Sequence, residues 1–195
     1  MRRLLSYMLL LSCFLLFPIN ISAQETCAEK PLGIMSCDIQ NLVLAYEQIK
    51  RCVELDGRAT VYVQGLGGII DHAHFFFDLM RTSGLSKKTT FISAGQIISS
   101  TNIIWLASEH RVVLPSVMFL LHKATVRFPG EDIGVITDYQ KQTWDTTQRL
   151  VQMATGNEST AKMWHDIIAG HRVGGTLDAE KALEIGWATE IRAYK

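Results

Sequence analysis

Two adjacent serines, a histidine and a pair of glycines lie at positions from which they could carry out acyl transfer. Ser99 and Ser100 stand in the stretch GQIISST, between an apolar strand-like segment and a helix-like segment. His122 ends the apolar run VMFLLH, and Gly67 and Gly68 follow another strand-like run. Acyl transfer needs a nucleophile, a base within hydrogen-bond reach and N–H donors that face the developing oxyanion. The sequence therefore contains a candidate for each of these roles.

Each candidate also has a purely structural interpretation. Serine is a favoured N-cap residue, so Ser99 or Ser100 as a plain helix cap is the alternative to a nucleophile. Lys123 offers a second base, in a Ser–Lys dyad. Adjacent residues of a strand point to opposite faces, so Lys123 and His122 cannot both face Ser99. The order and spacing of the candidates, rather than any single residue, favour a functional site.

The elements that must position these residues alternate between strands and helices. Helical spacing or helix signals predict helices over 38–55, 65–81, the segment after Ser99, 133–155, 159–169 and 178–185. Strands are expected at 59–64, 89–94, 117–122 and 188–193. This alternation indicates an α/β protein with a parallel sheet, in which sites form at the carboxyl ends of strands.

The order of these segments resembles the proteolytic subunit of the Clp protease, within the wider ClpP/crotonase superfamily. The family's N-S-P-G-G turn corresponds to QGLGG, its G-Q-A-A-S-M-G motif to GQIISST, and its R-x-x-L-P segment ending in I-H-Q-P to RVVLPSVMFLLHKA. A long helix ending in Thr155-Gly156 and the closing segment DAEKALEIGWATEI also match, so the resemblance spans roughly residues 32–192. It implies a ClpP/crotonase-like fold of repeated strand–strand–helix units with a long handle-type helix.

The resemblance also implies a serine-type peptidase. Ser99 becomes the candidate nucleophile and His122 the candidate base, while the backbone N–H groups of Gly68 and Ser100 become the oxyanion donors. The position of the family's catalytic aspartate falls on or beside Gly170, which has no carboxylate. Asp166 lies four residues earlier and is the candidate third member.

The third member has two alternatives, His171 or no residue at all. The main rival function is accordingly a catalytically inactive scaffold or peptide-binding protein of the same fold, and a pocket for an acyl thioester is a third hypothesis. A carboxylate beside the His122 ring and an open pocket above Ser99 would favour the enzyme. Ile97 or Ile98, which replace small alanines of the family motif, would favour the scaffold by filling that pocket.

Residues 1–23 have the pattern of a secretory signal peptide, with two arginines, a short apolar run and small residues before the expected cut. We expect residues 24–195 to form a single ClpP-like domain, exported to the periplasm or secreted. Cys27, Cys37 and Cys52 remain after cleavage, and an oxidising compartment permits one disulfide among them. The sequence does not indicate which pair forms, and three free thiols are the alternative.

Composition and compartment limit the expected partners. The chain has 19 basic and 19 acidic residues, which gives no reason to expect nucleic-acid binding. An exported protein would have no ATP-driven unfoldase, so we expect unassisted action on short or unfolded peptides, as a monomer or a homo-oligomer. We expect no cofactor and no metal, because His72 and His74 lie two residues apart and would not share a helix face.

Overall fold

The structure, a computed structural model, describes residue 27, residues 32–125 and residues 133–194. The predicted signal peptide lies outside the described residues. The strands are β1 (Leu32–Ile34), β2 (Ala59–Val63), β3 (Thr89–Ser93), β4 (Gln96–Ile98), β5 (His110–Val113), β6 (Met118–Leu121), β7 (Gly175–Leu177) and β8 (Glu190–Ile191). The helices are α2 (Ile39–Asp56), α3 (Ile70–Thr82), α4 (Thr101–Trp105), α5 (Ile133–Thr155), α6 (Glu158–Ile168) and α7 (Ala179–Glu184), with a 3₁₀ turn at Leu85–Lys87.

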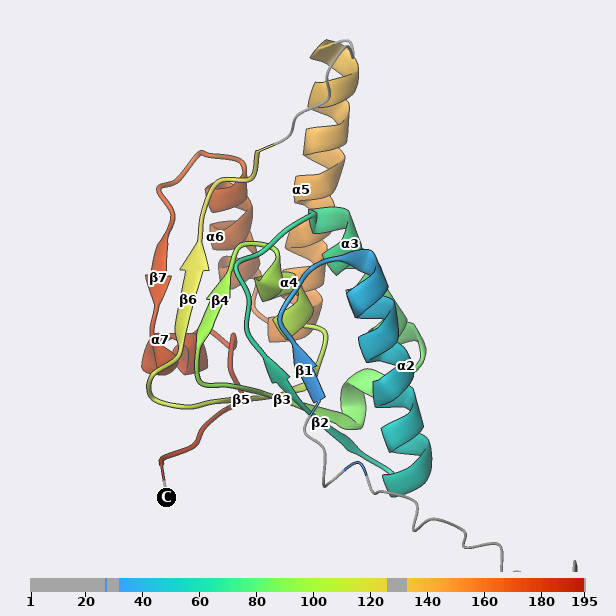
Figure 1. Cartoon of the computed structure of the whole chain (residues 1–195). Coiled ribbons are helices and arrows are strands. Elements are labelled where there is room, and N and C mark those ends of the chain that lie inside the picture. Colours follow the sequence, from blue (N-terminus) through green and yellow to red (C-terminus); the bar gives the residue numbers. More distant parts are fainter. Residues whose placement is uncertain (1–26, 28–31, 126–132, 195) are drawn as a thin grey trace, which may run out of the picture.

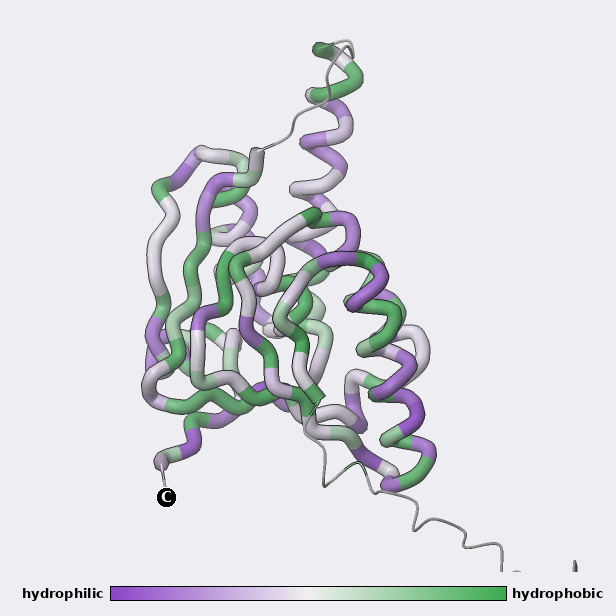
Figure 2. The backbone as a smooth tube through the Cα atoms, viewed as in Figure 1, coloured by the Kyte–Doolittle hydropathy of each residue, from purple (hydrophilic) through white to green (hydrophobic). Residues whose placement is uncertain are grey.

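Five strands form a parallel sheet in the order β1-β2-β3-β5-β8. The inward-facing residues of β2 are Ala59, Val61 and Val63, and each is at most 4% exposed. Parallel sheets are stable only when helices cover their faces, which is why the strands contain so many buried apolar residues. Figure 2 shows hydrophobic residues following the strands, while polar and apolar residues alternate along α2.

A second, smaller sheet has the order β4-β6-β7, with β4 parallel and β7 antiparallel to β6. In the chain, β4 follows β3 and is followed by α4. In the same way, β6 follows β5 and is followed by α5. The chain therefore repeats a strand–strand–helix unit, as β3–β4–α4 and as β5–β6–α5. The expected α/β fold of repeated strand–strand–helix units is confirmed.

The long helix predicted over 133–155 is α5, and its first turns project beyond the rest of the molecule (Figure 1). Its later turns pack against α6, and the buried residues of α5 are Thr143, Thr147, Leu150 and Val151. Ile133 and Val135, in the projecting part, are 80% and 57% exposed. Within the described residues, no helix is both long and apolar enough to cross a membrane.

Several element limits differ from the sequence-based expectation. The helix expected over 65–81 is α3, and it begins at Ile70. The chain from Gly65 stays extended and pairs with Ile97 in a parallel bridge. The three-residue strands β1, β4 and β7 were not expected. Such short strands carry too few residues to show the alternation by which strands are recognised in a sequence.

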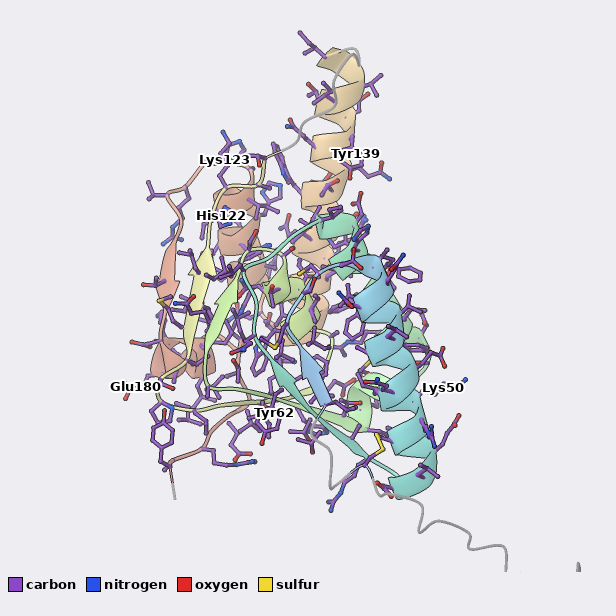
Figure 3. All side chains as sticks on the ribbon, in the orientation of Figure 1. Lys50, Tyr62, His122, Lys123, Tyr139 and Glu180 are labelled. Carbon is purple, nitrogen blue, oxygen red and sulfur yellow. A yellow bond between two sulfur atoms is a disulfide. The ribbon has the colours of Figure 1, made fainter. Side chains whose placement is uncertain are left out.

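Cys27 and Cys52 form a disulfide with a Cα–Cα distance of 5.4 Å, and Cys37 is a buried free thiol. The expectation of one disulfide with one thiol left over is confirmed, and the pair is now identified. The bond fastens the start of the described chain to the last turns of α2 (Figure 3).

Reduction of this disulfide is expected to lower the free energy of unfolding by roughly 3–4 kcal/mol, because the bond closes a loop of 25 residues in the unfolded chain. Urea unfolding with and without dithiothreitol measures the effect. A Cys27→Ser, Cys52→Ser double variant should match the reduced wild type and should no longer respond to dithiothreitol. Cys37→Ala is the control that should keep the response, and an equal response in the double variant would contradict the assigned pairing.

Candidate active site

Ser99 occupies a sharp turn between β4 and α4, with a φ of 56°. It is the one non-glycine residue with positive φ among those that the structure describes. A side chain in the left-handed region costs about 1 kcal/mol or more, and such strain concentrates at functional sites. The turn ends the strand abruptly and begins a helix, which leaves the Ser99 side chain half-buried at the carboxyl end of β4.

Asn102 holds this turn in place from a fully buried position in α4. Its side-chain Nδ2 donates to the carbonyl oxygens of Ser99 at 2.9 Å, Leu120 at 3.2 Å and Ile97 at 3.3 Å. Its Oδ1 accepts from the indole Nε1 of Trp187 at 3.1 Å. Asn102 is therefore a positioning residue that sequence reasoning missed. The available signal was a polar residue inside the apolar run TNIIW, where a buried amide must find partners.

The glycine turn at 67–68 packs directly against Ser99. A Cβ atom on Gly67 would lie 2.5 Å from the Cβ of Ser99 and 3.1 Å from its Oγ, and Gly67 has a φ of 98°. Only glycine combines that backbone conformation with so close an approach. The N–H of Gly67 donates to Thr101 Oγ1 at 3.0 Å, so this N–H is already used.

The two predicted oxyanion donors make no hydrogen bond within the described residues. The backbone N–H groups of Gly68 and Ser100 have no acceptor within the described part of the chain. The Ser100 hydroxyl is buried and donates to the carbonyl of Gly68 at 3.0 Å, which ties the two donor residues together. Ser100 therefore has a structural hydroxyl, and Ser99 carries the accessible one.

His122 follows the last residue of β6 and is exposed (Figure 3). Its Nδ1 lies 2.8 Å from the carbonyl oxygen of Lys123. A carbonyl only accepts hydrogen bonds, so this contact places the imidazole proton on Nδ1 and leaves the lone pair on Nε2. That is the tautomer a general base toward serine requires.

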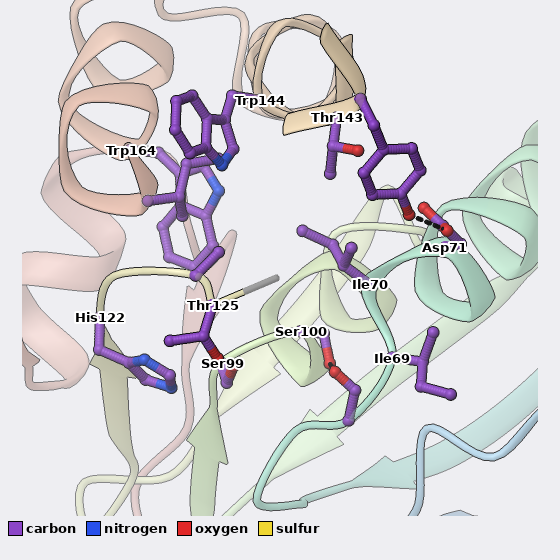
Figure 4. Close-up of a pocket in the computed structure, with 14 residues that line it drawn as sticks. Ile69, Ile70, Asp71, Ser99, Ser100, His122, Thr125, Thr143, Trp144 and Trp164 are labelled. Carbon is purple, nitrogen blue, oxygen red and sulfur yellow. Dashed lines mark hydrogen bonds between the residues drawn. The ribbon is translucent and has the colours of Figure 1, made fainter. Parts of the chain in front are cut away.

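Figure 4 shows the His122 ring turned toward Ser99. No hydrogen bond joins Ser99 Oγ to His122 among the residues described, which is common in ligand-free sites whose catalytic contacts tighten on binding.

The structure does not bring Asp166 to His122. Asp166 lies in α6, where its carboxylate accepts from Lys162 at 2.9 Å, and this hydrogen bond lowers the pKa of Asp166. At Gly170, the position expected for the family's aspartate, the neighbouring side chain is that of Lys123. A Cβ atom on Gly170 would lie 2.9 Å from Cδ and 3.1 Å from Nζ of Lys123, so a cationic side chain lies against this glycine. The imidazole of His122 is thus held by a backbone carbonyl, and no carboxylate contact to it exists within the described residues.

A cavity of about 420 Å³ brings together four of the five predicted site residues. Ser99, Ser100, Gly68 and His122 all line it. Figure 4 shows the side chains of Ser99, Ser100 and His122 at the cavity. The remaining lining residues come from α3, α5, α6 and the segment after β6. They are Ile69, Ile70, Asp71, Ala124, Thr125, Tyr139, Thr143, Trp144, Trp164 and Ile168.

The cavity is open beside Ser99 rather than filled by the bulky residues of the serine motif. Ile97 is completely buried in the core, and neither Ile97 nor Ile98 lines the cavity. The walls are mainly apolar, and the indole N–H groups of Trp144 and Trp164 are buried without an acceptor in the described structure. On the opposite side the Tyr139 hydroxyl donates to Asp71, and burial and this carboxylate raise the pKa of Tyr139. The space can therefore take an apolar group.

Comparison with known proteins identifies the family. The family model for the Clp protease matches residues 38–195, which is more than half of the chain. The chain therefore belongs to the Clp protease family. No curated protein sequence matches it.

Solved structures of the same fold include ClpP1 from Listeria monocytogenes, with a TM-score of 0.68 and 17% identity over 90% of this chain and 98% of that chain. An Asn-to-Asp mutant of ClpP1 from the same organism has a TM-score of 0.70 and 18% identity over the same shares of the two chains. Family and fold together support a ClpP-like peptidase in general. Members of this family form oligomers and act on peptide substrates.

Proposed function

We propose that this protein is a serine peptidase in which Ser99 attacks the peptide carbonyl and His122 accepts its proton at Nε2. The N–H groups of Gly68 and Ser100 stabilise the oxyanion. The observation that carries the proposal is the open cavity that all four residues line, with the His122 tautomer fixed by the Lys123 carbonyl. In place of a full triad, the base is oriented by a neutral acceptor, which gives less stabilisation to the imidazolium than a carboxylate does.

The walls of the cavity support peptides with a bulky apolar side chain as substrates. Trp164 and Ile168 from α6 and Ile70 from α3 would surround such a side chain.

The proposal includes export and action without an ATPase partner, on short or unfolded polypeptides. The Cys27–Cys52 disulfide supports export, because such bonds persist in oxidising compartments. Membership of the family supports a homo-oligomer, since members of this family form oligomers.

The second candidate function is an inactive scaffold or peptide-binding protein of this fold. Its support is the absence, within the described residues, of a carboxylate that contacts His122, together with the Lys123 side chain at Gly170. An apolar cavity would serve peptide binding equally well.

Labelling with a fluorophosphonate probe separates the two functions, because such probes react with activated serines. We expect wild type and Ser100→Ala to be labelled, and Ser99→Ala and His122→Ala to lose the label. Ser100→Ala is the matched control, since it removes an adjacent hydroxyl and keeps the backbone N–H. Circular dichroism checks that every variant is folded. An unlabelled but folded wild type would reject the peptidase and favour the scaffold.

A further inference from the structure

Three side chains outside the cavity form a compact group of metal-ligating atoms. His165 and Asp166 belong to the last turn of α6, and His171 follows the helix. One donor atom from each residue lies within 4.8 Å of the others. The combination of two imidazoles and one carboxylate is a donor set that zinc prefers in proteins.

The backbone after α6 is folded so that His171 returns to the end of the helix. Gly170 has a φ of 80°, and its N–H donates to the carbonyl of Ile167 at 3.1 Å. The N–H of Arg172 then donates to the carbonyl of Asp166 at 2.9 Å. These bonds reverse the chain direction after α6. The reversal places His171 beside His165 and Asp166, so that the three side chains form one group.

The distances within the group suit a small tetrahedral ion. Bonds of about 2.0–2.1 Å from zinc place neighbouring ligand atoms about 3.3 Å apart. Nδ1 of His165 and Oδ1 of Asp166 are already 3.5 Å apart. The His171 side chain is exposed, so it can rotate to close the remaining separation.

A second carboxylate orients the His165 ring from the far side. Oδ1 of Asp145, on α5, lies 3.6 Å from Nε2 of His165. Oδ1 of Asp166 lies at the other nitrogen, 3.5 Å from Nδ1, so each ring nitrogen has a carboxylate beside it. An ion bound between Nδ1 and Asp166 would keep the ring proton on Nε2, where it faces Asp145. Metal-binding histidines commonly have such a carboxylate behind the ring, where it fixes the tautomer and raises the basicity of the ligand.

We propose that His165, Asp166 and His171 bind one Zn²⁺ ion, with Asp145 as the orienting carboxylate behind His165. Three protein ligands leave the fourth tetrahedral position to water. The bound ion links α6 to the turn that contains Gly170, next to Lys123. Its expected role is to hold this turn, independently of whether Ser99 is reactive.

One cation competes with zinc at the site. Nζ of Lys162 lies 2.9 Å and 3.2 Å from the two carboxylate oxygens of Asp166. Lys162 is exposed, and an exposed ion pair of this kind contributes little free energy, so a divalent ion can replace the ammonium. Removal of Lys162 should consequently strengthen zinc binding.

The test is titration of the EDTA-treated purified protein with ZnCl₂ by isothermal calorimetry, together with a thermal melt at each zinc concentration. We expect one Zn²⁺ per chain and a melting temperature that rises with zinc. His165→Gln and His171→Ala should each weaken binding by about a hundredfold or more, and Asp145→Asn by about tenfold. Lys162→Gln should strengthen zinc binding by roughly two- to fivefold, because zinc then no longer has to displace an exposed ion pair from Asp166.

Matched controls exclude binding elsewhere. His110→Ala removes an exposed histidine outside the group, and Lys181→Gln removes the lysine of a comparable pair with Glu184, so both should bind zinc as wild type does. The proposal is overturned if wild type binds no zinc, or if His171→Ala binds as tightly as His110→Ala.

Discussion

Giving His122 a carboxylate partner is expected to raise the proposed peptidase activity by roughly a hundredfold. The change is the double variant Gly170→Asp, Lys123→Ala. Gly170 stands where the family resemblance places the catalytic acid, and the Lys123 side chain lies against it. Lys123→Ala is needed because the ammonium would otherwise pair with the introduced carboxylate. The backbone carbonyl of Lys123, which holds Nδ1 of His122, is retained in the variant.

The expected gain is smaller than the factor of about 10⁴ lost when the acid is removed from a complete triad. Part of that loss comes from the wrong imidazole tautomer, and here the Lys123 carbonyl already fixes the tautomer. The carboxylate would add stabilisation of the imidazolium. The strain at position 170 is tolerable, because aspartate is among the residues that best accept a positive φ such as the 80° found there.

The matched control is Gly170→Asn, Lys123→Ala, which has the same shape without the charge. Hydrolysis of a short fluorogenic peptide measures kcat/KM for both variants. A nearby negative charge raises the pKa of a histidine, so the acidic limb of the pH profile should move to higher pH only in the aspartate variant. Equal rates and equal profiles in the two variants would show that His122 is not the base or that position 170 does not face it.

The sequence was sufficient to predict the nucleophile turn, the histidine and the glycine turn as neighbours. They follow β2, β4 and β6. The parallel pairings of Gly65 with Ile97 and of β4 with β6 bring the carboxyl ends of these strands together. The cavity lined by Ser99, His122 and Gly68 has this origin. The long helix could also be predicted with its limits, since its pattern extends over many turns and Gly156 follows its last residue.

Other parts of the site depend on contacts that no local pattern records. The Lys123 carbonyl holds His122 through the backbone, which any residue type at 123 would supply. Asn102 acts on Ser99 through a buried amide and is itself held by Trp187, 85 residues away. The pairing of Cys27 with Cys52 depends on where the first residues lie against α2, and spacing alone left it open.

Arg111→Met is expected to lower the free energy of unfolding by about 3–5 kcal/mol, because buried carbonyl oxygens lose the guanidinium that donates to them. Arg111 is 3% exposed, and burial, with a smaller contribution from Arg81, lowers its pKa to about 10, so it stays protonated at neutral pH. The guanidinium donates to backbone carbonyls rather than to a carboxylate. The acceptors are Ser108, Ala154 at 3.1 Å, Gly186 at 3.0 Å and Trp187 at 3.0 Å.

These bonds join β5 to the last turn of α5 and to the turn after α7. The helix end at Ala154 also carries a partial negative charge that suits a cation. Methionine fills a similar volume but removes the guanidinium donor from all four carbonyls. The carbonyl of Trp187 keeps the indole N–H of Trp105 at 2.8 Å, so at most three acceptors lose their donor, and each buried unsatisfied acceptor costs about 1–3 kcal/mol before water or relaxation reduces it. Arg192→Met, at an exposed arginine, is the control and should change stability by less than about 0.5 kcal/mol.

The same substitution should also slow the reaction of Ser99 in protein that remains folded. Arg111 and the indole of Trp105 both donate to the carbonyl of Trp187. The indole of Trp187 donates to Asn102, which donates to the Ser99 carbonyl. Loss of one of the two donors to the Trp187 carbonyl is therefore expected to loosen the strained turn that carries Ser99. Urea unfolding measures the first effect, and the rate of fluorophosphonate labelling well below the melting temperature measures the second. A variant that is destabilised but labels at the wild-type rate would show that Asn102 keeps the turn without help from Trp187.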